Sequence, residues 1–323
     1  MNRPKPRVTT LLLTRRARAF KRHLRAAVEG DGHGVHQARV ASRRLREAVP
    51  VLATGLKGSK AGKARRKIRR IAQALGTIRE LDVTLGLIDE LAARNTLPRL
   101  ALEEIRGRVV KDQTRRRHVM LKRIARINVD KLDRRLRSVG DALQSAETEG
   151  WRETLGARLL KRSKALATAI EAAGPLYEQE RLHRVRIAAK KLRYAMELAA
   201  ESGARSALVP VRTIKRVQDT LGRLHDLQVV QGYIAASQAA PSTRTPQDGG
   251  LDIIGRLLEE ECRHLHARYL SSVPAVQQIV EVTRTAIVPQ VARTRLRPLK
   301  MHLQPAKRRE SDQFLLAAGG QGR

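Results

Sequence analysis

Two segments of this chain carry the same pattern of charged and titratable side chains. The first begins VHQARVASRRLR at residue 35, and the second begins LHRVRIAAKKLR at residue 182. In each, a histidine is followed by basic residues three, seven, eight and ten positions later: His36 by Arg39, Arg43, Arg44 and Arg46, and His183 by Arg186, Lys190, Lys191 and Arg193. A guanidinium group can bind two phosphate oxygens at once, and an imidazole can donate a hydrogen bond to an anion. These residue types predict a site for a multivalent anion.

The spacing puts most of these residues on one face of an α-helix. At about 100° per residue, they form a first stripe (His36, Arg39, Arg43 and Arg46) and a second stripe (His183, Arg186, Lys190 and Arg193), with alanine, valine and leucine on the opposite faces. Like charges at this spacing disfavour an isolated helix by about 0.2–0.5 kcal/mol per pair. Glu47 is expected to relieve Arg43, and Glu197 to relieve Arg193. The middle of each stripe lacks such an acid, so a bound anion would relieve it.

The two histidines are expected to make binding depend on pH. An unperturbed histidine titrates near pH 6.5, so binding should strengthen as the pH falls through roughly that value. His36 follows a glycine-rich segment. We therefore expect it in the first turn of its helix, where backbone amides also favour an anion.

The overall composition also indicates a polyanionic partner. The chain of 323 residues contains 66 Lys and Arg against 31 Asp and Glu, which gives a formal net charge of +35. Aromatic residues make up only 2% of it, and Ala and Leu dominate, as in helical proteins. Cys262 is the only cysteine, so no internal disulfide can form. No apolar run is long enough to span a membrane, and we expect a soluble, cytoplasmic protein.

Helical periodicity extends along most of the chain. It predicts helices near 9–29, 35–53, 61–76, 78–94, 98–123, 127–147, 152–172, 177–201, 206–221, 223–237, 251–270 and 275–293. Glycine and proline mark breaks near 30–32, 55–58, 95–98, 150, 174–175, 202–203 and 289. No run with two-residue alternation indicates a strand. Residues 240–250 are predicted to form a flexible loop.

The similarity between the two segments extends beyond the stripes. Residues 75–83 (LGTIRELDV) match 221–229 (LGRLHDLQV) at an offset of 146. At the same offset Arg70 matches Arg216, and His118 with Lys122 matches His264 with Arg268. We predict an all-α protein of two pseudo-symmetric helical bundles that arose by internal duplication. The halves span about 8–147 and 152–293 within one compact domain (1–295), and a basic, disordered tail (296–323) follows.

The paired stripes resemble the signature of the CHAD family, named for a conserved-histidine α-helical domain. The resemblance covers roughly residues 8–295. It implies a basic cleft or pore between the two bundles that binds inorganic polyphosphate. Both stripes, with Arg44 and Lys191, would line it, and Arg70 and Arg216 would be their neighbours. The internal repeat adds a less direct set of candidates: His118, Lys122, His264 and Arg268.

Two alternatives to polyphosphate binding follow from the residues. Charge alone also fits sequence-nonspecific binding to RNA or DNA phosphates, although few aromatic side chains are available to stack on bases. His225-Asp226 resembles part of a metal-dependent phosphohydrolase site, but Arg79-Glu80 occupies the matching position, and nothing marks Cys262 as an activated nucleophile. We therefore predict a non-enzymatic polyphosphate-binding protein that needs no metal or cofactor. Association with polyphosphate granules is compatible with this prediction.

Overall fold

Every regular element in the described part of the chain is a helix, as predicted. The computed structural model describes residues 7–29, 31–58, 60–94, 96–145, 150–239 and 248–293. The tail 296–323 and residues 240–247 of the predicted loop lie outside these ranges.

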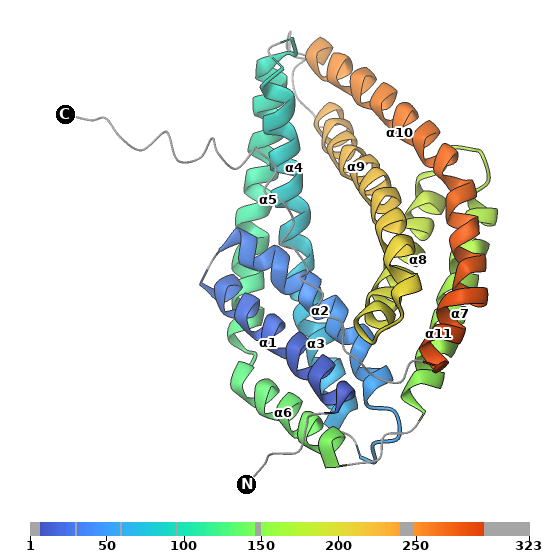
Figure 1. The fold of residues 1–323 in the computed structure, drawn as a ribbon. Helices are drawn as coiled ribbons and strands as arrows, with labels where there is room; N and C mark the ends of the chain where they lie inside the picture. Colours follow the sequence, from blue (N-terminus) through green and yellow to red (C-terminus); the bar gives the residue numbers. More distant parts are fainter. Residues whose placement is uncertain are drawn as a thin grey trace.

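The helices follow one another in a similar order in the two halves of the chain (Figure 1). The first half contains α1 (Val8–Val28), α2 (Gly32–Leu52), α3 (Lys60–Ala74), α4 (Gly76–Ala92), α5 (Arg99–Ala125) and α6 (Val129–Ser145). The second half contains α7 (Trp151–Ala173), α8 (Gln179–Glu201), the 3₁₀ turn η1 (Arg205–Ala207), α9 (Leu208–Gln238), α10 (Asp248–Val282), the π-helical turn η2 (Thr283–Ile287) and α11 (Val288–Arg293). This order agrees with the predicted duplication, which itself stays a prediction.

Several predicted boundaries are wrong because single glycines and prolines do not end the helices. The predicted helices 206–221 and 223–237 form one helix, α9, which continues through Gly222. Pro274 lies inside α10, so 251–270 and 275–293 also run together. Residues 248–250, predicted as loop, begin α10, and Pro289 lies within α11. By contrast, the breaks at Gly55, Gly150, Gly174 and Gly203 are turns with positive φ angles, which glycine adopts readily.

Residues from both halves contribute to each of two hydrophobic clusters. The larger cluster extends from α1 to α11 and includes Phe20, Leu45, Leu192 and Tyr269. The smaller cluster joins α4 and α5 to α9 and α10, the four helices that form the upper part of Figure 1. Because both cores are shared between the halves, the helices of the two halves are held in fixed contact.

The start of α2 is fixed by its close approach to α1. A Cβ atom at Gly34 would lie 2.7 Å from Ala26 Cβ and 2.8 Å from the backbone nitrogen of Ala27, so only glycine fits there. The carboxylate of Asp31 caps the helix by accepting hydrogen bonds from the backbone amides of His33 and Gly34 at 2.9 and 3.0 Å. The helix thus begins earlier than predicted, and His36 lies in its second turn.

Candidate anion-binding site

The two stripes meet where α2 packs against α8. We use the term central cluster for four residues: Arg39 and Arg43 of α2, and Arg186 and Lys190 of α8. Burial, followed by the charges of the other three residues, lowers the pKa of Lys190 to about 6. Burial and the charge of Arg43 lower the pKa of Arg39 to about 10, and Arg186 contributes to this shift. Cations from both halves therefore lie close enough together to repel one another.

The apolar faces of the same two helices are buried, as the spacing predicts. Ala38, Leu45 and Ala48 of α2 are fully buried, as are Val185 and Leu192 of α8. Each helix thus contributes its hydrophobic side to the core and its basic side to the contact between the halves. The fully buried apolar side fixes the direction in which the basic side points.

Two polar atoms beside the central cluster are buried without a hydrogen-bond partner among the described residues. They are Nδ1 of His36 and Nε of Arg186. Buried polar groups are normally paired, so these atoms offer two unused hydrogen-bonding positions to a ligand. Burial, followed by the charges of Arg79, His33 and Arg39, lowers the pKa of His36 to about 4. The prediction that His36 gains charge near pH 6.5 is therefore wrong for the free protein.

Two carboxylates from α4 and α9 lie at the edge of the central cluster. The rings of His183 and His225 are 5.3 Å apart, and Nε2 of His225 lies 3.5 Å from Oε1 of Glu80. Interaction with His225 lowers the pKa of Glu80. Burial raises the pKa of Asp226, against the opposing effect of Arg186. The acids Glu80 and Asp226, together with Arg79, belong to this site although the sequence did not identify them as site residues.

The signal that could have identified these residues was their position in the repeat. Arg79-Glu80 and His225-Asp226 occupy matching places in the two segments that follow the stripes. Inspection of the sequence alone connects His225-Asp226 only with an incomplete metal site. In the structure, the two pairs lie beside the stripes that their halves contribute.

Arg44 and Arg193 are held by a buried carboxylate, and this pairing limits their access to a ligand. Glu197 accepts from Nε of Arg44 and from Nη1 of Arg193, each at 2.7 Å. Arg193 also donates from Nε to Gln218 of α9 at 2.8 Å. The expected pair between Glu197 and Arg193 is confirmed. We infer that these contacts hold α2, α8 and α9 together.

The other acid expected to relieve a stripe has different partners. Glu47 lies 3.1 Å from Arg158 and 3.7 Å from Arg162, both on α7, and the expected pair between Glu47 and Arg43 is therefore wrong. Arg43 is left in the central cluster without that acid. The structure thus keeps one cation of the first stripe free of the carboxylate four positions away.

The remaining candidates lie on the surface. Lys191, Arg70, Arg216, His118, Lys122, His264 and Arg268 are all exposed. Within the described ranges, no hydrogen bond or ion pair joins any of them to the central cluster. Arg46 is half-buried, between the central cluster and α3. Burial and then the charges of Arg69 and Arg43 lower its pKa.

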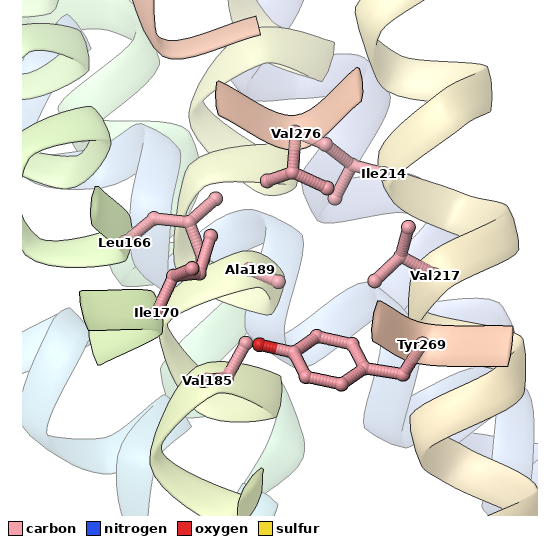
Figure 2. A pocket seen from close by; sticks show the side chains of 8 residues that line it. All are labelled: Leu166, Ile170, Val185, Ala189, Ile214, Val217, Tyr269 and Val276. Atoms are coloured by element: carbon pink, nitrogen blue, oxygen red, sulfur yellow. The ribbon is translucent and has the colours of Figure 1, made fainter. Parts of the chain in front are cut away.

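A cavity in the second half has a different character from the predicted basic cleft. It leaves no room for a molecule the size of water and is lined by apolar side chains of α7, α8, α9 and α10, as Figure 2 shows. The hydroxyl of Tyr269 points into this region and has no hydrogen-bond partner among the described residues. The cavity is not the predicted cleft or pore, which stays a prediction.

Three further features concern the alternatives. No group of three or more His, Cys, Asp or Glu residues in the described ranges is arranged to hold a metal ion. Cys262 is buried, and burial raises the pKa of its thiol, which disfavours the reactive thiolate. Among the helices described, none has the length and apolar character needed to cross a membrane.

Solved structures with a similar fold are known. The crystal structure of the CHAD domain from the plant Ricinus communis matches 85% of this chain and 90% of its own, with a TM-score of 0.56 and 20% identity. PptA from Streptomyces chartreusis matches 84% of this chain over all of its own length, with a TM-score of 0.59 and 15% identity. At these identities the likeness concerns the fold.

Sequence comparison identifies related proteins and a family. Two proteins of Mycobacterium tuberculosis, "Uncharacterized protein MT2285" of strain CDC 1551 and "Uncharacterized protein Rv2226" of strain H37Rv, are each 31% identical over 238 residues. The match covers 68% of this chain but 44% of those relatives, so the chain spans less than half of their length. The family model of the CHAD domain matches residues 11–235, and the chain therefore belongs to the CHAD family.

Proposed function

We propose that this protein binds inorganic polyphosphate through the central cluster, without catalysing its cleavage or synthesis. The observation that carries the proposal is the meeting of Arg39, Arg43, Arg186 and Lys190 across α2 and α8. Burial and the charges of neighbouring cations there disfavour the charged forms of Arg39, Arg186 and Lys190. A phosphate chain would relieve that repulsion and would form charge-assisted hydrogen bonds with the guanidinium groups. The unpartnered atoms His36 Nδ1 and Arg186 Nε add two hydrogen-bonding positions at the same place.

A linear phosphate chain suits this site better than a nucleic acid. The cations of the central cluster are half-buried between two helices. A ligand without bases or sugars therefore meets less steric hindrance when it approaches them. The chain contains only two Phe, four Tyr and one Trp, which leaves few side chains on which bases can stack. Nucleic-acid binding remains the second candidate because of the large excess of positive charge. The proposal includes a location of the protein in the cytoplasm, in association with polyphosphate granules.

The test is a competition binding assay on the full chain at physiological salt. Labelled long-chain polyphosphate is displaced by unlabelled polyphosphate, RNA or DNA at equal concentrations of phosphate. We expect polyphosphate to compete best, and affinity to fall steeply with added salt because phosphate contacts release counterions. More effective competition by RNA would favour the nucleic-acid alternative. Release of inorganic phosphate during the assay would contradict the non-enzymatic part of the proposal.

A further inference from the structure

We propose that a long polyphosphate chain leaves the central cluster across a basic surface on α3 and α6. We use the term α3–α6 band for the basic residues of α3 from Lys63 to Arg70, together with Lys131 and Arg135 of α6. This inference rests on the proposed function and extends the site to chains longer than the central cluster can cover. A single stripe is only about 15 Å long, at about 1.5 Å per helical residue.

Arg46 connects the central cluster to the α3–α6 band. It belongs to the first stripe and lies on α2, which packs against α3. After burial, the charges of Arg69, Arg43 and Arg65 each act on its guanidinium group. Positive charge therefore continues from Arg43 to the nearer edge of α3.

The same positive surface continues from α3 to α6. Nζ of Lys60 donates to Oγ of Ser138 at 3.0 Å, and Nζ of Lys67 donates to the carbonyl of Asn128 at 3.3 Å. These contacts hold the far edge of α3 against α6 and the turn before it. Arg135 and Lys131 both act on Lys67, whose pKa burial also lowers. The basic residues of α3 therefore span the exposed face of this helix from α2 to α6.

The cations of the α3–α6 band are available to a ligand. In the described part of the chain, none of them forms an ion pair with a carboxylate. Arg65, Arg66, Arg69, Arg70 and Lys131 are exposed. Arg70, which the sequence placed beside the stripes, belongs to this surface.

The second half has a less basic counterpart of this surface, because only three of the six α3 cations have basic matches on α9. At the offset of 146, Arg212, Lys215 and Arg216 of α9 match Arg66, Arg69 and Arg70, whereas Val209, Val211 and Thr213 stand where α3 has Lys63, Arg65 and Lys67. At this offset, the residues from Val276 to Val291 match residues of α6. The only basic residue among them is Arg284. Arg284 lies 2.6 Å from Glu281, so its charge is already compensated.

The test compares two triple variants of the full chain, each with three exposed cations reversed and thus with the same net charge. The band variant is Arg66→Glu, Arg70→Glu, Lys131→Glu, and the control is Lys161→Glu, Lys164→Glu, Arg256→Glu on α7 and α10. Binding of tripolyphosphate and of long-chain polyphosphate is measured at several salt concentrations. The band variant should bind the long chain about tenfold more weakly, with a salt slope reduced by about one for each lost phosphate contact. Its affinity for tripolyphosphate should change by less than about twofold, because the central cluster is intact.

The outcomes separate this inference from the proposed function. If the control weakens long-chain binding as much as the band variant does, only overall charge matters and the inference is wrong. If the band variant loses RNA binding but keeps long-chain polyphosphate binding, the surface recognises nucleic acid and the inference is also wrong. If the wild-type chain binds neither polyphosphate, the proposed function fails, and the inference fails with it. Retained long-chain affinity in the band variant, beside normal wild-type binding, overturns the inference alone.

Discussion

The two stripes have nearly the same sequence pattern but acquire different properties in the fold. In the first half, the stripe supplies arginines only, and its histidine is neutral because burial and Arg79 lower its pKa to about 4. In the second half, the stripe contains Lys190, whose pKa falls to about 6, and it lies beside Asp226, whose pKa burial raises. The first half therefore contributes fixed charge, whereas the second contributes groups that respond to pH.

The two stripes also end differently. Glu197 follows the second stripe, whereas Pro50 holds the matching place after the first, at the offset of the two histidines. Glu197 binds one arginine from each half, Arg44 and Arg193. One carboxylate of the second half therefore fixes the position of the first stripe. The two stripes are thus alike in their cations but differ in the acids that position them, and this difference can be tested.

The largest expected effect is the loss of stability in Glu197→Gln. Removing a charge that pairs with two partly buried arginines should lower the free energy of unfolding by about 3 kcal/mol, because the arginines lose their partner. Denaturant unfolding measures this effect. The matched control is Glu260→Gln, at an exposed glutamate of α10, which should change stability by less than about 0.5 kcal/mol. Equal effects of the two variants would contradict a structural role for Glu197.

The same variant has a predicted pH dependence. Burial opposes ionisation of Glu197, but Arg44 and Arg193 outweigh it and hold its pKa below the usual value. A carboxyl group with a lowered folded pKa stabilises the protein above the unfolded value of about 4.3, and this contribution is lost as pH falls through the folded pKa. Wild type should therefore lose more stability on acidification than Glu197→Gln does. Parallel pH profiles would contradict this prediction.

The next largest effect is expected for reversal of one cation from each stripe. Arg43→Glu with Lys190→Glu should weaken polyphosphate binding by about a hundredfold or more, because two attractive contacts become repulsive. Circular dichroism should show unchanged helix content. Lys161→Glu with Lys164→Glu carries the same charge change on α7 and should have little effect on affinity. Retained affinity in the first double variant would place the site elsewhere.

A smaller effect concerns the pH dependence of binding, and it distinguishes the two halves directly. Because the pKa of free Lys190 is about 6, binding of an anion at neutral pH must draw a proton onto this amine. Affinity should then fall as pH rises above 6, by up to about tenfold per pH unit. In Lys190→Arg this fall should be reduced, since the guanidinium stays charged. Any titration of the ligand itself affects wild type and Lys190→Arg equally. Identical pH profiles of the two proteins would therefore exclude Lys190 as the titrating group.

The smallest effect is expected for the two carboxylates. Asp226→Asn removes a negative charge beside Arg186 and Lys190, and affinity for polyphosphate should rise by about three- to tenfold. Glu80→Gln should increase affinity less, because Glu80 is more exposed and its charge interacts with His225. Binding isotherms at neutral pH measure both. Weaker binding in Asp226→Asn would show that this carboxylate supports the site.

The sequence predicted the helices and the two stripes well because both depend on local spacing. The positions of Ala38 and Leu45 relative to Arg39 and Arg43 follow from the helical period alone, and they are buried as predicted. Helix ends were predicted less well. Gly222 and Pro274 carry the usual signals for a break, yet α9 and α10 continue through them, because packing of long helices outweighs the local cost.

The sequence by itself determined three properties: the helical period, the excess of positive charge, and the placement of cations opposite an apolar face. The charge follows from composition, and the other two are set by residues within a few turns of one another. Only the tertiary structure decided which cations are available. Arg43 and Arg44 are neighbours in sequence, but one joins the central cluster and the other is bound by Glu197, 153 positions away. The low pKa of Lys190 and the presence of Asp226 likewise depend on burial and on distances between helices. Spacing along a chain does not contain these quantities, because they arise when distant segments pack.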